Sequence, residues 1–183
     1  LLSAGSLRAQ GSVALKTNLL YGGYTATPNL GMEFGLNRHL TLEVAGGYNP
    51  WNLNRTDGSR KRVHYLLTSE LRYFFLNRLN GHYLGAHVVY GQYNINKYEL
   101  PLLFGKGSKA YRHEGSAYGG GLSYGYQFLL GRRWNLELGI GAGVMLLEYD
   151  KYDCVSCGEK RQHENRTYYG LTKASVSLIY IIK

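Results

Sequence analysis

Apolar and polar residues alternate with a period of two along most of the chain, which is the pattern of β-strands with one apolar and one polar face. The alternation predicts about eight strands, each close to the ~9–11 residues that span a membrane when a strand is tilted. The predicted strands occupy residues 13–21, 30–36, 40–48, 65–75, 84–91, 122–128, 136–144 and 176–182.

The connections between these strands alternate in length. Three are short and similar, at residues 36–39, 76–79 and 130–133. The others are longer, at about 49–62, 94–113 and 150–166, except for the first of this set, at 22–28. Short turns on one side and long loops on the other are typical of outer-membrane barrels. We therefore predict an all-β fold, an eight-stranded antiparallel up-and-down transmembrane β-barrel.

Aromatic residues gather near the ends of the predicted strands, where the rings of a membrane barrel meet the lipid headgroups. The long-loop side has Tyr21, Tyr48, Trp51, Tyr90 and Tyr93. The short-turn side has Phe74, Phe75, Tyr83, Phe128 and Trp134. We expect these residues to form two belts around the barrel.

Charged residues inside the predicted strands share one face with many of the glycines. They are Lys16, Glu33, Glu43, Glu70, Arg72, Glu137 and Lys173. Side chains fill the interior of a barrel of this size, and buried charges there must pair. We predict an internal network of ion pairs and hydrogen bonds, without an open pore. His87 lies on the same face, and we expect it to be a hydrogen-bonded member of the interior.

The opposite arrangement of faces defines an alternative. A soluble, lipocalin-like barrel that binds a small apolar ligand has apolar residues inside and polar residues outside. Alternation by itself does not say which face is inside. The membrane barrel is favoured because a lipid-facing Glu or Arg is expensive.

Composition and the first residues agree with an exported, strand-rich chain. The 183 residues include 25 Gly and 18 Tyr but only 3 Pro. The longest apolar run, 176–182, is far shorter than the ~18 residues of a membrane helix. Residues 1–10 resemble the end of a secretory signal peptide, with Ala9 before Gln10, although a disordered tail is the alternative. Residues 11–183 are then a single outer-membrane β-barrel domain.

The two cysteines, Cys154 and Cys157, lie close together in a predicted surface loop. In an exported protein such a pair indicates a disulfide. A zinc site is less favoured because zinc normally takes four ligands and only His163 is near. The sequence predicts no metal and no other cofactor.

Basic residues dominate the predicted long loops, and the formal net charge is +9. Because Arg and Lys bind phosphate well, lipopolysaccharide or a partner protein is a candidate ligand, whereas nucleic acid is not expected. The alternative is a solvated loop surface. The candidate contact residues are Arg60, Lys61, Arg62, Lys106, Lys109, Arg112, Lys160 and Arg161.

Catalytic motifs are weak. Residues 121–125 match the G-x-S-x-G pattern of serine hydrolases, but they lie within an alternating strand with no predicted helix after it. A lipid-modifying barrel enzyme needs a His, a Ser and an acid close together. The outer-side histidines His64, His113 and His163 have no evident partners in the sequence. We predict no catalytic residues.

Several short motifs resemble a family of Bacteroidetes barrels known as domain of unknown function 3575. They are residues 14–21 (ALKTNLLY), 27–33 (TPNLGME), 46–51 (GGYNPW), 70–73 (ELRY), 91–94 (GQYN), 124–127 (YGYQ), 131–137 (GRRWNLE) and 178–183 (LIYIIK). The resemblance implies an outer-membrane barrel of the Bacteroides and Porphyromonas lineage, often encoded near fimbrial or surface-assembly genes. It transfers no catalytic residue.

These observations together favour a non-enzymatic small outer-membrane β-barrel. It is expected to be a structural or accessory subunit of a surface, fimbrial or other outer-membrane assembly, with basic extracellular loops that contact lipopolysaccharide or a partner protein. The alternatives are a lipid A-modifying enzyme, such as a deacylase or acyltransferase, and the ligand-binding barrel.

Overall fold

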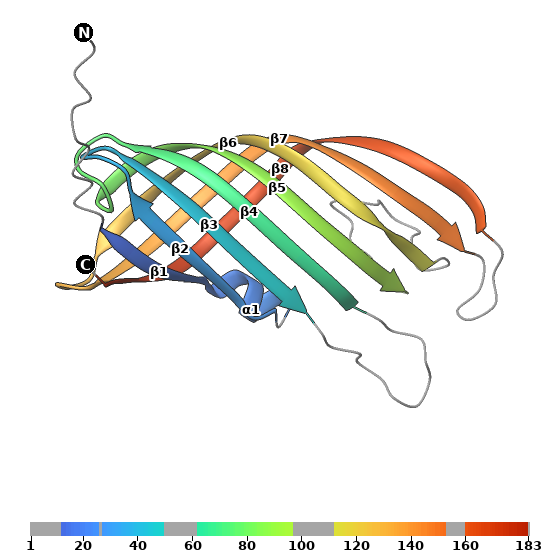
Figure 1. Ribbon diagram of the computed structural model, residues 1–183, viewed down its shortest axis with the longest axis horizontal. Coiled ribbons are helices and arrows are strands. Elements are labelled where there is room, and N and C mark those ends of the chain that lie inside the picture. The colour runs from blue at the N-terminus through green and yellow to red at the C-terminus, as the bar shows by residue number, and fades with distance from the viewer. Residues whose placement is uncertain (1–11, 26, 50–61, 97–111, 153–159, 183) are drawn as a thin grey trace, which may run out of the picture.

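The computed structural model describes residues 12–25, 27–49, 62–96, 112–152 and 160–182, which form eight strands and one short helix. The elements in chain order are β1 (Val13–Asn18), α1 (Leu19–Thr25), β2 (Asn29–Gly35), β3 (Leu40–Asn49), β4 (Arg62–Phe74), β5 (Gly81–Asn96), β6 (Arg112–Leu129), β7 (Trp134–Tyr152) and β8 (Lys160–Ile181). Each strand pairs antiparallel with the next, and β1 pairs with β8, so the sheet closes on itself. The predicted all-β, eight-stranded up-and-down barrel is confirmed (Figure 1).

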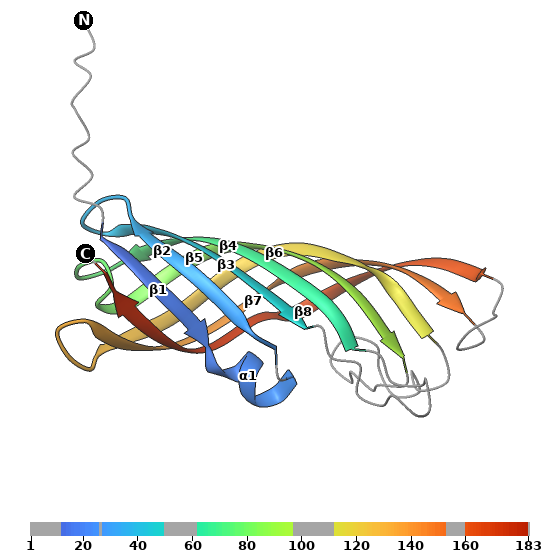
Figure 2. The same cartoon turned by 60° about the horizontal axis from the view of Figure 1, so that its bottom comes forward.

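The strands differ in length much more than the alternation predicted. They grow from 6 residues in β1 to 22 in β8. The strands β5 to β8 therefore extend beyond the ends of β1 to β3 on the long-loop side (Figures 1 and 2). They take in parts of the predicted loops 94–113 and 150–166. The hydrogen-bonded ladder continues there, although side chains that are polar on both faces give no alternating signal in the sequence.

The first strand is predicted to continue to Tyr21, but it ends at Asn18, and the helix α1 replaces its end. Asn18 explains the change. Its Oδ1 accepts a hydrogen bond from the Leu20 amide at 3.1 Å, as an N-terminal helix cap does. The same oxygen accepts from the Val176 amide at 3.2 Å, and Asn18 Nδ2 donates to the Ala174 carbonyl at 3.1 Å. One side chain thus ends the β1–β8 ladder and begins the helix.

Replacing Asn18 by alanine is expected to lower the free energy of unfolding by about 1–2 kcal/mol, because it removes a helix cap and two ladder-end hydrogen bonds. Urea denaturation of the refolded barrel measures this change. Hydrogen exchange at the Val176 amide should become faster in the same variant. The control is Asn165→Ala, since Asn165 is exposed, and equal midpoints for the two variants would contradict the assignment.

The barrel interior is layered along its axis. An apolar cluster near the short turns contains Ala14, Leu79 and Ile179. The charged residues occupy the middle. A second apolar cluster lies toward the long-loop side and contains Ala117, Met145 and Leu147, with Tyr168 packed against them. The interior is therefore filled rather than hollow, as expected for eight strands.

Two aromatic residues that were expected in the short-turn belt lie inside the barrel instead. Phe74 and Tyr83 are both 0% exposed, and their rings pack 5.3 Å apart. The prediction was wrong because Phe74 shares the inward parity of Arg72 on the same strand. A Cβ atom on Gly125 would lie 2.5 Å from the Tyr83 ring, so glycine is needed there to admit the ring. Phe74 and Tyr83 fill the interior on the short-turn side of the charges.

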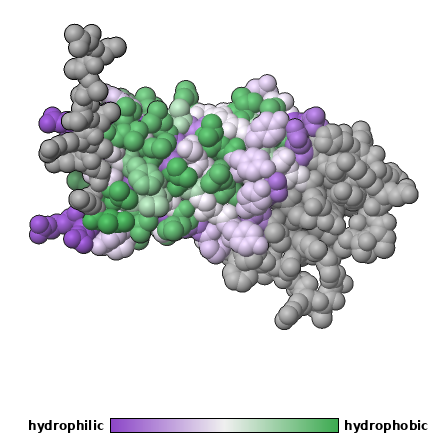
Figure 3. All heavy atoms as spheres, in the orientation of Figure 1, coloured by the Kyte–Doolittle hydropathy of each residue, from purple (hydrophilic) through white to green (hydrophobic). Residues whose placement is uncertain are grey.

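The outer wall is apolar. Large hydrophobic side chains are exposed on every strand from β2 to β8, and in Figure 3 they gather in a band over the short-turn half of the described surface. Exposed aromatic residues border this band. Tyr48 and Tyr90 lie on the long-loop side, and Phe128 and Trp134 lie near the short turns. Tyr21 is half-buried on α1, whereas Trp51 and the Tyr93 side chain lie outside the described residues.

No helix in the described parts of the chain is long and apolar enough to cross a membrane.

Candidate functional site

The charged middle layer is the most distinctive group of side chains in the molecule. The structure brings together all seven residues that the sequence singled out, from β1, β2, β3, β4, β7 and β8. Arg72 lies at the centre and is 0% exposed. Its Nη1 donates to Glu33 and to Glu137 at 3.0 Å each, and its Nε donates to Glu70 at 2.6 Å. Its Nη2 contacts Glu43.

Two lysines add to the positive charge of Arg72, so that three cations face the four carboxylates. Lys16 Nζ lies 2.8 Å from Glu43 and 2.5 Å from Glu137. Lys173 Nζ lies 2.5 Å from Glu70 and 3.7 Å from Glu43. Each of the four carboxylates therefore meets at least one cation: Glu33 meets one, Glu70 and Glu137 meet two each, and Glu43 meets three. Such mutual pairing is what makes buried charge tolerable in a low-dielectric interior.

The strand register explains why the guanidinium is needed at this place. Glu33 on β2 is directly opposite Glu43 on β3, and Glu43 is directly opposite Glu70 on β4. Like charges in such cross-strand positions repel one another. Arg72 lies on β4 two residues after Glu70, and its guanidinium contacts all three of these carboxylates.

Neutral side chains satisfy further carboxylate oxygens. Thr41 Oγ1 donates to Glu33 at 2.6 Å, Gln127 Nε2 donates to Glu137 at 2.9 Å and Ser175 Oγ donates to Glu137 at 3.2 Å. Ser123 Oγ donates to Glu70. These four residues are not among the predicted network members, although they share the inward parity of the charges.

The serine of the G-x-S-x-G pattern is therefore a structural donor. Ser123 is 4% exposed and lies inside β6, which continues to Leu129 without a helix. The hydrolase motif requires a strand-to-helix turn that exposes the serine. The described geometry does not provide one.

A β-bulge on β8 gives His87 a hydrogen-bond partner. The β7–β8 register shifts so that Lys173 pairs with Gly141 and Leu171 pairs with Ala142. Thr172 is the extra residue, and its Oγ1 lies 2.8 Å from His87 Nε2. His87 is thus hydrogen-bonded through one ring nitrogen, while Nδ1 has no protein partner among the described side chains.

The carboxylates do not form an obvious metal site. Oxygen atoms of Glu33, Glu43 and Glu137 lie within 4.8 Å of one another, close enough to share a divalent cation. Arg72 contacts all three of these residues. A protein cation therefore takes the position that a metal ion would need.

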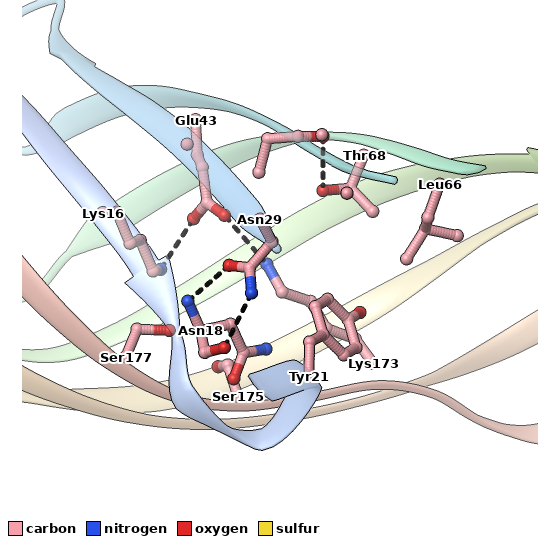
Figure 4. A pocket seen from close by; sticks show the side chains of 14 residues that line it. Lys16, Asn18, Tyr21, Asn29, Glu43, Leu66, Thr68, Lys173, Ser175 and Ser177 are labelled. Atoms are coloured by element: carbon pink, nitrogen blue, oxygen red, sulfur yellow. Dashed lines mark hydrogen bonds and ion pairs between the residues drawn. The ribbon is translucent and has the colours of Figure 1, made fainter. Parts of the chain in front are cut away.

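A small cavity, lined by both polar and apolar residues, lies beside the network, between it and α1. Its volume is about 30 Å³, which is room for about two water molecules. Figure 4 shows Lys16 and Lys173 both pointing toward Glu43 at this cavity, with Asn29 and Tyr21 close by. Ser177 Oγ lines the cavity and has no hydrogen-bond partner in the described part of the protein. Ordered water, rather than a larger ligand, fits this space.

The outer-side histidine His64 has a partner that the sequence did not reveal. His64 Nε2 lies 3.2 Å from Thr27 Oγ1, to which Asn49 Nδ2 donates at 3.0 Å. Thr27 is 3% exposed, so its hydroxyl is shielded from a substrate. This trio joins the segment before β2 to the last residue of β3 and the start of β4.

Several predicted residues cannot be placed. Cys154, Cys157, Arg60, Lys61, Lys106 and Lys109 lie outside the described residues, as does the predicted signal segment 1–10. Arg62, Arg112, Lys160 and Arg161 are described only as backbone, where they begin β4, β6 and β8 on the long-loop side. Their roles as a disulfide or as lipopolysaccharide and partner contacts stay predictions.

Because its interior is filled, the barrel is predicted not to conduct ions as an open pore does. The purified barrel in a planar bilayer should give no large, stable conductance steps, because Arg72 and its partners occupy the middle and Phe74 and Tyr83 fill the space on the short-turn side. Single-channel recording measures this directly. Reproducible large steps in the wild-type protein would overturn the prediction, and a porin recorded under the same conditions is the positive control.

These features define a class: an eight-stranded up-and-down barrel with a charged, filled interior and an apolar outer wall. The chain belongs to the family described as protein of unknown function (DUF3575), whose model matches residues 1–182. No curated protein matches the chain.

Proposed function

We propose that this protein is a non-enzymatic barrel of the outer membrane of a Gram-negative bacterium, and that it is a structural or accessory subunit of a surface assembly. The observation that carries the proposal is the exposed apolar band on the wall. Soluble proteins rarely expose such an area, whereas a membrane barrel buries it in lipid. The charges lie on the inward face, which is the reverse of the ligand-binding alternative.

The non-enzymatic part of the proposal rests on the hydroxyl groups beside potential bases. Ser123 is bonded to Glu70, and Thr27 is held between His64 and Asn49; both hydroxyls are buried. A lipid-modifying enzyme needs a nucleophile that the acyl chain can reach. Mass spectrometry of lipid A from a deletion strain tests this alternative, and a changed acyl pattern would favour the enzyme.

The long-loop end is the proposed contact side. It carries the basic residues of the predicted loops and the strand starts at Arg62, Arg112 and Lys160. Phosphate groups of lipopolysaccharide, or acidic groups of a partner protein, suit this charge. The short turns are then on the periplasmic side.

Fractionation of the native cells tests the membrane proposal. The protein should remain with the outer-membrane fraction after density-gradient separation and should resist extraction by urea, because the wall holds it in lipid. A known periplasmic protein serves as the control for release. Recovery of the barrel in the soluble periplasm would refute the proposal.

A further inference from the structure

The last strand has a long edge that no described strand covers. The strand β7 pairs with β8 from Lys160 to Tyr180. On the other side, β1 pairs with β8 only from Ser177 to Ile181. Asn18 then bonds Ala174 and Val176 and ends the ladder. Above this point, within the parts of the chain that are described, β8 has a strand neighbour on one side only.

The bulge determines which backbone groups face the open edge. Alternate residues of an antiparallel strand direct both N–H and C=O toward the same neighbour. Below the bulge, the amides of Val176 and Ile182 point to the β1 side. The extra residue reverses this alternation. Above it, Thr167, Tyr169 and Leu171 are therefore the residues whose backbone groups face the edge.

The position of this edge agrees with exposure to water rather than lipid. Unpaired backbone groups are not tolerated against hydrocarbon. The β1–β8 ladder covers only Ser177 to Ile181, which is shorter than the ~9–11 residues of a spanning strand, and α1 contacts β8 as well. The part of β8 that extends past both is the part expected in water. The β1–β8 pairing closes the wall only below Asn18, and β5 to β8 extend past it together (Figures 1 and 2). Their extension forms an open sheet on the long-loop side, with β8 at its border.

The side chains on this edge do not protect it. Natural edge strands usually carry lysine, proline or a bulge to prevent pairing. Between Asn165 and Leu171 there is neither lysine nor proline, the only charged residue is Arg166, and the bulge lies below this segment. Tyr169 is 75% exposed and Leu171 is also exposed, which offers apolar contacts to an added strand.

We propose that the free edge of β8 binds an extended, acidic segment of a partner protein, which continues the sheet as an additional antiparallel or parallel strand. The acidic character follows from charge complementarity. The outer part of β8 contains Lys160, Arg161, His163 and Arg166 but only one acid, Glu164. This assignment rests on the proposed accessory function and specifies the chemistry of the partner.

A peptide probe tests the edge in the full-length barrel, folded in detergent. The probe is a short fluorescent peptide of alternating Val and Glu, compared with the same peptide N-methylated at alternate amides and with a Val–Lys version. Fluorescence anisotropy should show binding that falls by about tenfold or more with either change, since one removes ladder hydrogen bonds and the other reverses the charge. Equal binding of the N-methylated peptide would overturn strand addition, and charge attraction would then be the only explanation of the binding.

A pair of protein variants provides the matched test. Thr167→Pro removes an edge-facing amide, whereas Thr167→Val keeps the amide and a β-branched side chain. The proline variant should lose about tenfold in affinity for the Val–Glu peptide, while the valine variant should bind as the wild type does. Unchanged binding of a folded proline variant would refute the edge assignment. If that variant does not fold, the N-methylated peptide gives the answer on the wild type.

The peptide assay and the cell fractionation can fail separately. Loss of peptide binding with the barrel still in the outer membrane would reject only the β8 edge. Recovery of the barrel in the soluble periplasm would reject the membrane proposal, whatever the peptide does.

Discussion

Replacing Arg72 by methionine is expected to destabilise the barrel by about 3–5 kcal/mol or to prevent its folding, because breaking a buried ion pair leaves uncompensated charge. Four glutamates would then face only Lys16 and Lys173 in a closed interior. Methionine keeps much of the side-chain volume, so the loss of stability reflects the lost charge more than the lost packing. Urea-dependent refolding, followed by the mobility shift of the folded barrel on gels, gives the measurement.

The control for this experiment is the same substitution at an exposed site. Arg132 is exposed in the turn between β6 and β7, and Arg132→Met should leave the unfolding midpoint nearly unchanged. Arg72→Met combined with Glu70→Gln and Glu137→Gln should recover part of the lost stability, since two carboxylates then balance two lysines. A midpoint for Arg72→Met equal to that of Arg132→Met would show that the network is not held together by the guanidinium.

The second large effect concerns the outer wall. Leu122 is 72% exposed and lies on β6 between Tyr118 on the long-loop side and Phe128 near the short turns. If the wall faces lipid, Leu122→Arg should lower stability in vesicles by about 2–4 kcal/mol, which is the range for a cation near the middle of a bilayer. On a wall that faces water, the same change should have little effect.

Two variants isolate the contribution of lipid. Leu122→Ala removes the side chain without adding charge, and Leu130→Arg places the same charge in the exposed turn after β6. Both should be milder than Leu122→Arg when folding is titrated with urea in lipid vesicles. A Leu122→Arg barrel as stable as the Leu130→Arg barrel would count against a lipid-facing wall.

The alternating pattern was sufficient to predict the strand number, the short turns and the direction of the charged side chains. A strand places successive side chains on opposite faces, and this property is local to each segment. The inward positions of Glu33, Glu70 and Arg72 therefore followed from sequence once one face was taken as the interior. The same parity assigns Phe74 to the interior, although its place near a strand end had suggested a belt.

Other parts of the site depend on long-range pairing that alternation does not encode. Which glutamates are opposite one another depends on the register between strands, and the register is set jointly by all eight pairings of the closed sheet. The bulge that turns Thr172 toward His87 is one extra residue in a long strand and leaves no periodic signal. The helix α1 replaced the end of the first predicted strand because Asn18 bonds to groups on β8, far away in sequence.

The sequence by itself thus determined which residues of a predicted strand share a face, because side-chain direction follows from the position along each strand. The tertiary structure alone decided which inward charges meet, where the wall closes and, among the described strands, where β8 has a neighbour on one side only. Those features depend on how far each strand slides past its neighbour, and that sliding is fixed only when the whole barrel closes.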